Sequence, residues 1–237
     1  MIISCDASQL EWRVASELSG DQIALTEIRD KQDTHTLNQR AFNLPSRLIA
    51  KIYLFRTIFR GSGWAFANDP EFLHVSSSAK YWDNVNELFY RKYNGLDQWH
   101  KHMASLVMSN KPIVGPMGRS WTINIARDSH GNVKVPWTTL SNYPVQGTGA
   151  DVMKMARIMA YRRIKKLDIP CDFITTVHDS IVTDAPSQYL QPIADTFLQV
   201  FKDLPDAIKT TFGYTWTVPL DCEVKYGPNF KDMVKYS

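Results

Sequence analysis

The feature that most constrains the fold is a pair of strand-like segments that end at aspartates and lie at opposite ends of the chain. An apolar run over residues 1–5 stops at Asp6, and residues 173–183 suit a β-hairpin with His178 and Asp179 near its tip. The residues between them show mainly helical spacing. We therefore expect an α+β fold, in which an antiparallel sheet brings Asp6 and Asp179 together and a helical subdomain is inserted between them.

Helical spacing of apolar residues and capping signals locate the other elements. The expected helices cover residues 11–18, 33–42, 46–59, 76–91, 96–108, 146–166 and 188–202. Strands are expected at residues 121–125 and 133–135, with a turn at 129–132 between them, and within residues 216–224. These elements predict three consecutive parts: residues 1–32 in the sheet domain, 33–137 in the helical subdomain, and 138–237 back in the sheet domain.

Composition narrows the class of protein. Hydrophobic residues make up 44% and charged residues 22% of the chain, as in ordinary soluble globular proteins. Three cysteines without a C-x-x-C pair favour neither a disulfide framework nor a zinc site. No signal segment or run of 18 apolar residues is found, so a reduced, cytoplasmic location and no membrane contact are expected. A net charge of +3 permits a nucleic-acid partner without demonstrating one.

The two aspartates suit a site for two divalent cations. In two-metal phosphoryl transfer the ions lie about 3.5–4 Å apart and stabilise both the attacking and the leaving oxygens. Mg²⁺ takes oxygen ligands, usually one or two protein carboxylates plus water and substrate phosphates. Asp6 and Asp179 could supply these carboxylates. Taken alone, each acid would more often cap a helix or a turn.

A second candidate feature is one face of the helix expected after Ser46. Arg47, Lys51, Phe55 and Phe59 recur every four residues and share a face with a slow drift. The two cations could hold phosphates while the aromatic rings stack on a base or sugar. For an arbitrary helix, a solvated basic edge beside a core stripe would be the preferred interpretation.

Five segments resemble, in the same order, those of the family A (DNA polymerase I-like) DNA polymerases. Asp-x-Ser-Gln-x-Glu-x-Arg at residues 6–13 resembles motif A, the face described above resembles motif B on the fingers helix, and Val-His-Asp at residues 177–179 resembles motif C. Asp-Thr-His at residues 33–35 and Asn-x-Pro-x-Gln-Gly-Thr-x-Ala-Asp at residues 142–151 match two further family segments. The resemblance covers nearly the whole chain and implies a palm sheet with inserted fingers.

The resemblance also implies roles for individual residues. It implies that Asp6, Asp179 and the Ala7 carbonyl ligate two Mg²⁺ ions, for which Mn²⁺ could substitute. Seven residues would surround the incoming nucleotide, namely Ala7, Glu11, His35, Arg47, Lys51, Phe55 and Phe59. Within that set Lys51 would also protonate the leaving pyrophosphate, and Glu11 would act as a steric gate against a ribose 2′-hydroxyl. Asn142, Gln146 and His178 would face the primer–template DNA.

The sequence departs from the family pattern at several positions. Ser180 follows Asp179 where the family usually has a Glu, so the neighbouring carboxylate is lost. Phe59 stands where a Tyr is common, and Arg56 and Arg60 replace glycines. The His-Asp-Ser sequence at residues 178–180 is reminiscent of single-subunit RNA polymerases.

The resemblance implies that parts of a polymerase are missing. In the family, the thumb and any exonuclease domain precede motif A, which begins here at residue 6. We expect a DNA-directed DNA polymerase palm–fingers subunit or fragment that needs a second polypeptide supplying the thumb and a 3′–5′ exonuclease. A compact split enzyme would suit a phage or other mobile element.

Three alternatives are open. One is a fragment of a single-subunit RNA polymerase, although Glu11 and Phe55 favour deoxynucleotides. Another is an inactive nucleic-acid-binding accessory subunit, and a third is a two-metal nuclease, which would not need the Arg47–Lys51–Phe55 face.

Overall fold

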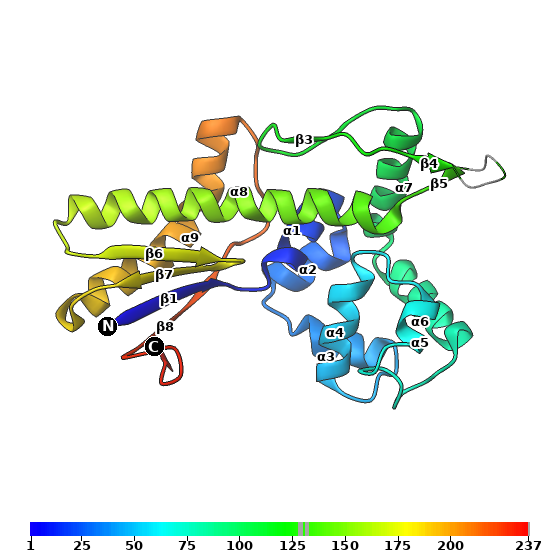
Figure 1. Ribbon diagram of the computed structural model, residues 1–237, viewed down its shortest axis with the longest axis horizontal. Helices are drawn as coiled ribbons and strands as arrows, with labels where there is room; N and C mark the ends of the chain where they lie inside the picture. The colour runs from blue at the N-terminus through cyan, green and yellow to red at the C-terminus, as the bar shows by residue number, and fades with distance from the viewer. Residues whose placement is uncertain (128–129, 131–132, 237) are drawn as a thin grey trace. The chain divides into compact units, whose positions relative to one another are not determined.

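The computed structural model describes residues 1–127, 130 and 133–236. Most of the turn expected at residues 129–132 therefore lies outside the described residues. The chain divides into two compact units, Met1–Leu10 with Gly147–Ser237, and Glu11–Gln146. The first unit contains the main sheet and the second is mostly helical (Figure 1). An antiparallel sheet combined with helices confirms the expected α+β class.

The first unit is built on a five-stranded antiparallel sheet. In order across the sheet, its strands are β6 (Asp172–Val177), β7 (Ser180–Asp184), β1 (Ile2–Ala7), β8 (Cys222–Gly227) and β9 (Val234–Lys235). The hairpin expected at the C-terminal side of the chain is β6–β7. Because β1 pairs with both β7 and β8, the first strand of the chain is central in the sheet.

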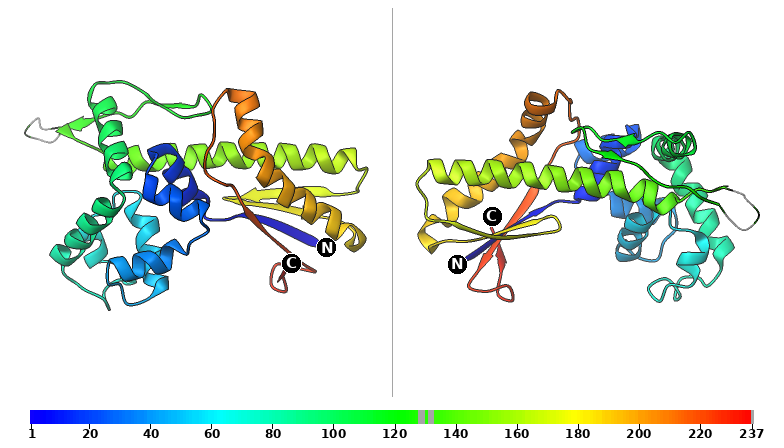
Figure 2. Two further views of the ribbon diagram at one scale, coloured as in Figure 1. Left: turned by 180° about the vertical axis from the view of Figure 1, so that it is seen from behind. Right: turned by 45° about the horizontal axis from the view of Figure 1, so that its top comes forward.

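Alternation along β1 separates an apolar face of the sheet from a polar one. Ile3 and Cys5 are fully buried, whereas Ser4 and Asp6 point to the opposite face because successive strand side chains alternate. The apolar face packs against α9 (Leu190–Phe212), whose buried stripe includes Phe197. Figure 2 shows α9 crossing the sheet. This packing fixes the register and leaves Asp6 on the polar face.

The helices α8 (Trp137–Lys166) and α9 are longer than expected. The first of them was expected to begin at residue 146, but it begins at Trp137 and continues through the buried Pro144, which lacks an N–H group. In α9, Pro205 is likewise accommodated within the helix. Within the residues described, no helix is both long and apolar enough to cross a membrane.

Among its described residues, the second unit contains seven further helices and two short antiparallel strand pairs. They are α1 (Leu10–Ser19), α2 (Gln22–Arg29), α3 (Thr34–Ala41), α4 (Arg47–Thr57), α5 (Gly63–Ala67), α6 (Ala79–Lys92), α7 (Asn94–Met108), β2 (Ile113–Val114), β3 (Ser120–Trp121), β4 (Ala126–Arg127) and β5 (Val133–Lys134). Side-chain oxygens of Asp21, Asp33, Ser46, Ser62 and Ser78 cap five of these helices.

The strand expected at residues 121–125 was mostly wrong. Only Trp121 of this stretch lies in a strand, where it pairs with Ile113 of β2. Ile123 and Ile125 instead pack against a buried cluster that includes Met103 and Val107. Their apolar character reflects this packing rather than an extended ladder.

A buried polar network holds α2, α3 and α6 of the second unit together. The Tyr93 hydroxyl lies 2.8 Å from both Glu27 Oε2 and Asn38 Oδ1. Lys92 Nζ lies 2.8 Å from Glu27 Oε1 and 2.8 Å from Asn38 Oδ1. The ring of Trp12 on α1 packs edge-on against Tyr93. These contacts give partners to the Tyr93 hydroxyl, the Glu27 carboxylate and Asn38 Oδ1, which offsets the cost of burying them.

Candidate functional site

The sheet of the first unit places Asp179 beside the end of β1. His178 and Asp179 form the two-residue turn between β6 and β7, with a positive φ of 53° at His178. Tight hairpin turns need this left-handed conformation. The Ala7 amide donates to the Asp179 carbonyl at 2.8 Å. The turn residue thus lies next to Asp6 and Ala7, although the chain separates them widely.

Two hydroxyl groups contact the Asp6 carboxylate. Ser180 lies directly opposite Asp6 in the β1–β7 ladder, and its Oγ donates to Asp6 Oδ1 at 2.5 Å. Ser4 Oγ donates to Asp6 Oδ2 at 3.4 Å and lies 3.3 Å from Ser180 Oγ. These contacts orient Asp6 while leaving lone pairs on its carboxylate for other partners.

This donor set fits Mg²⁺ held partly by substrate. Among the residues the structure describes, no group of three or more His, Cys, Asp or Glu side chains gathers as a metal site. Two carboxylates, from half-buried Asp6 and exposed Asp179, are nevertheless the usual protein contribution where phosphates and waters complete the shell. The Ala7 carbonyl belongs to the same strand end.

An acid that the sequence reasoning missed lies on the strand next to Asp6. Glu223 of β8 is the ladder partner of Asp6, so both side chains point to the polar face. Glu223 pairs with Lys225 at 3.0 Å and Lys235 at 2.6 Å, and these lysines lower its pKa. The register of β8 against β1, which a single strand pattern does not give, would have been needed to find it.

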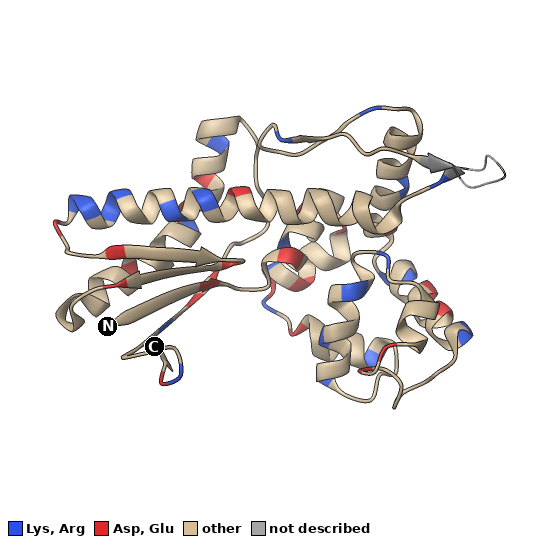
Figure 3. Cartoon of the chain, viewed as in Figure 1, with Lys and Arg blue, Asp and Glu red and all other residues tan. Residues whose placement is uncertain are grey.

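The helix α4 in the second unit presents the expected basic face. Ser46 caps this helix by accepting from the Ile49 amide. Arg47 and Lys51 are exposed and Phe55 is half-buried, one turn apart along the helix. The helix ends at Thr57, two residues before Phe59, and is therefore slightly shorter than expected. Basic residues on α4 are visible in Figure 3.

His35 packs beside this face from the start of α3. Its ring centroid lies 6.1 Å from that of Phe55, and its side chain is buried. Burial, followed by the charges of Arg47 and Lys51, lowers the pKa of His35. The imidazole is therefore neutral at pH 7 and can donate a hydrogen bond without carrying charge. The structure brings together His35, Arg47, Lys51 and Phe55.

Arg47 has a carboxylate partner that the sequence reasoning did not identify. Asp33, the N-cap of α3, accepts from Arg47 Nε at 2.7 Å and from its Nη2 at 3.1 Å. This guanidinium lowers the pKa of Asp33 well below its usual range. The pairing depends on how α3 and α4 pack, so helical spacing alone could not reveal it.

Two further predicted residues of the second unit contact each other. The Gln146 side-chain amide on α8 donates a short hydrogen bond to Glu11 Oε1 on α1. Asn142 lies one turn before Gln146 on the same face of α8. Glu11 therefore meets an amide donor from a position expected to face DNA.

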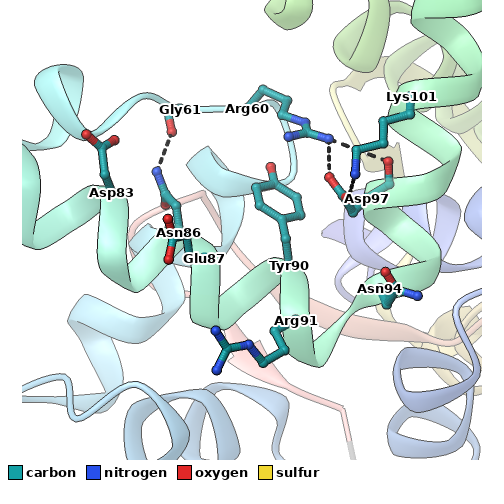
Figure 4. Close-up of a pocket in the computed structure, with 10 residues that line it drawn as sticks. All are labelled: Arg60, Gly61, Asp83, Asn86, Glu87, Tyr90, Arg91, Asn94, Asp97 and Lys101. Carbon is teal, nitrogen blue, oxygen red and sulfur yellow. Dashed lines mark hydrogen bonds and ion pairs between the residues drawn. The ribbon is translucent and has the colours of Figure 1, made fainter.

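A cavity of about 730 Å³ in the second unit involves a different set of residues. Its lining residues come from the segment after α4 and from α6 and α7. Figure 4 shows Arg60 and Lys101 converging on Asp97. Their ion pairs measure 2.5 Å and 2.6 Å. None of the sequence-predicted site residues lines this cavity. Its charges are mutually compensated, so it does not resemble a triphosphate site.

Basic residues also recur along the C-terminal half of α8 (Figure 3). Its last turn carries Arg163, Lys165 and Lys166, where positive charge complements the helix dipole. Arg163 pairs with Asp203 at 2.7 Å. These charges have a structural explanation and do not by themselves identify a DNA surface.

Comparisons with known proteins agree with this arrangement. The family model described as DNA polymerase family A matches residues 1–232. DNA polymerase I of Chloroflexus aurantiacus is 23% identical over 243 residues, and that of Aquifex aeolicus is 22% identical over 231 residues. These alignments cover 98% and 90% of this chain but only 24% and 38% of the relatives. The chain thus spans well under half of either relative.

A solved structure shows the same fold. The POL domain of Pol1 from M. smegmatis, in complex with DNA primer-template and dNTP, matches with a TM-score of 0.77 at 19% identity. The match covers 95% of this chain and 39% of that chain.

Proposed function

The chain belongs to DNA polymerase family A, and we propose that it is the palm and fingers part of a template-directed DNA polymerase. It would add deoxynucleotides to a primer 3′ end. We assign residues 33–137 to the fingers, with residues 1–32 and 138–237 as the palm. The observation that carries the proposal is the pairing of the strand end at Asp6 with the hairpin turn at Asp179.

Asp6, Asp179 and the Ala7 carbonyl are the groups that would hold Mg²⁺. When bound, Mg²⁺ would activate the 3′-hydroxyl of the primer and neutralise charge on the triphosphate. Ser180 holds the Asp6 carboxylate by its 2.5 Å hydrogen bond, so this ligand is oriented before metal binds. In the reaction the 3′-oxygen bonds to the α-phosphorus and the bond from that phosphorus to pyrophosphate breaks.

The basic face of α4 would bind the triphosphate. The Arg47 guanidinium can form parallel hydrogen bonds to phosphate oxygens, and Lys51 adds a compact charge one turn away. Neutral His35 would donate to a phosphate oxygen without adding charge. Lys51 would also give a proton to the departing pyrophosphate.

Sugar and base selection would use a second set of residues. Phe55 and Phe59 would pack on the nucleotide, with Phe55 stacking on it. Glu11 would crowd a ribose 2′-hydroxyl, and its contact with Gln146 holds the carboxylate in place. Asn142, Gln146 and His178 would contact the primer–template.

Single-nucleotide addition tests the proposed activity without demanding processive synthesis. Wild-type protein should add the complementary dNMP to a primer–template hairpin with Mg²⁺, and with Mn²⁺ in its place. Addition independent of the template base would contradict template direction.

A second candidate, an RNA polymerase of the single-subunit type, is favoured by His178-Asp179-Ser180 alone. Incorporation of dNTPs and rNTPs should be compared for wild type and Glu11→Ala. The DNA proposal predicts a wild-type preference for dNTPs that the substitution weakens. A wild-type preference for rNTPs would support the RNA candidate instead.

Because the chain spans a minor part of its relatives, further residues would complete the enzyme. We propose that a second polypeptide supplies a thumb and a 3′–5′ exonuclease. Mixing this chain with candidate partners should lengthen the products per binding event. Equally long products from the chain alone would contradict the need for a partner. A phage or mobile-element source stays a prediction from the sequence.

A further inference from the structure

Asp33 forms an ion pair with Arg47, one of the two cations that we assign to the triphosphate. The two hydrogen bonds, at 2.7 Å and 3.1 Å, use Nε and Nη2, which form one edge of the guanidinium. A phosphate group would use the same kind of edge, because both anions present two oxygens at matching spacing. Carboxylate and phosphate are therefore competitors for this edge of Arg47.

We propose that Asp33 is an affinity-setting residue, an internal counter-ion that a nucleotide triphosphate must displace from Arg47. The inference rests on the proposed function in assigning Arg47 to the triphosphate. It gives Asp33 a role beyond capping α3: the carboxylate holds Arg47 in place between substrates and reduces its affinity for each incoming polyphosphate.

The surroundings of the pair suit such an exchange. The side chains of Arg47 and Asp33 are 54% and 44% exposed, so water can replace either partner at small cost. The lowered pKa of Asp33 keeps it ionised throughout the neutral range. After displacement, Asp33 still has the Thr36 hydroxyl at 2.7 Å and the Thr36 amide as donors. Neither anion would be left without a partner.

Another arginine in this unit shows the opposite environment. Arg60 and Asp97 are only 20% and 13% exposed, and Arg60 Nε also donates to His100 Nδ1 at 3.0 Å. The guanidinium further stacks over Tyr90. This arginine is fixed on several sides, whereas Arg47 is held by an exposed carboxylate that an anion can reach.

Asp33→Asn separates the charge from the cap. Asn is as good an N-cap as Asp, so α3 should keep its first turn while Arg47 loses its anionic partner. Glu71→Gln is the matched control. Glu71 pairs at 2.7 Å with Arg56, which lies on α4 as Arg47 does. Arg47→Ala identifies how much binding depends on this guanidinium.

Binding of tripolyphosphate and dATP is measured by calorimetry without primer, with deoxyadenosine as the uncharged ligand. We expect Asp33→Asn to bind both polyphosphates about two- to five-fold more tightly, the range that exposed ion pairs support. Deoxyadenosine binding should not change, and Glu71→Gln should match wild type. The gain should vanish in the Asp33→Asn/Arg47→Ala double variant.

Unchanged or weaker polyphosphate binding by Asp33→Asn would overturn the inference, since Asp33 would then be neutral or would help to position Arg47. The inference would also be overturned if the wild type did not bind polyphosphate, or if Arg47→Ala bound polyphosphate as tightly as the wild type. A different result would contradict the proposed function. If polyphosphate binding depends on Arg47 but no template-directed nucleotide addition is found, the polymerase activity is contradicted, whereas the comparison of wild type with Asp33→Asn is still valid.

Discussion

Ser180 Oγ donates to Asp6 Oδ1 at 2.5 Å across the β1–β7 ladder. This hydroxyl stands where the sequence comparison with family A leads one to expect a second acid beside Asp179. A neutral donor lowers the negative charge of the site, and it fixes the direction in which Asp6 presents its free lone pairs. The residue after the turn therefore orients the Asp6 carboxylate, the metal ligand that we propose, instead of adding a second acid.

Ser180→Ala should raise the Mg²⁺ concentration needed for half-maximal activity about ten-fold, because a hydrogen bond to a charged group contributes about 1.5 kcal/mol or more. Mn²⁺ binding, followed by electron paramagnetic resonance without substrate, should weaken in parallel. Ser4→Ala, which removes a longer 3.4 Å contact, should have a smaller effect. Equal effects of the two substitutions would argue against a special role for Ser180.

Gln146→Ala should lower discrimination against ribonucleotides about five-fold, since the Glu11 carboxylate loses an amide donor that holds it. The ratio of dNTP to rNTP incorporation measures this directly. Asn142→Ala, one turn away on α8, should change primer–template affinity without changing that ratio. If both variants keep the wild-type ratio, Gln146 does not position the gate.

Acid should destabilise the second unit through His100. Burial, followed by the charge of Arg60, lowers the pKa of His100 to about 3. Below pH 6.5 the imidazole of His100 is protonated in the unfolded chain but stays neutral in the folded one. The free energy of unfolding therefore falls as the pH is lowered from 6.5 to about 3. At pH 5 this amounts to about 2 kcal/mol, at 1.36 kcal/mol per pH unit.

Urea unfolding at pH 7 and pH 5 tests the role of His100. His100→Gln should reduce the loss of unfolding free energy between the two pH values. His102→Gln, an exposed position on the same helix, should leave it unchanged. An identical pH dependence in wild type and His100→Gln would exclude this histidine as the cause.

Tyr93→Phe should lower the free energy of unfolding by about 1–3 kcal/mol, because Glu27 and Asn38 both lose the nearby hydroxyl in a buried setting. Tyr81→Phe on the same helix bundle serves as a control for removing a phenol that is less buried. If Tyr93→Phe lowered the free energy of unfolding by less than Tyr81→Phe does, the network would not depend on the Tyr93 hydroxyl.

The sequence predicted the strand that carries Asp6, the hairpin turn at Asp179 and the cap at Ser46, because local patterns determine them. Each follows from apolar alternation, a turn or a side-chain oxygen near its own backbone. Contacts between elements could not be predicted in this way. Glu223 opposite Asp6 depends on strand register, and Asp33 against Arg47 depends on how two helices pack.

Single-turnover nucleotide addition with wild type and Asp179→Asn on one primer–template is the most direct test of the proposed polymerase site. Wild type should add only the complementary dNMP, and Asp179→Asn should be slower by about 1,000-fold or more, since losing a metal ligand removes several kcal/mol of transition-state stabilisation. DNA binding by the two proteins, measured by anisotropy, should be similar. Equal rates of addition by wild type and Asp179→Asn would contradict the proposed metal site at Asp6 and Asp179, and with it the proposed mechanism of nucleotide addition.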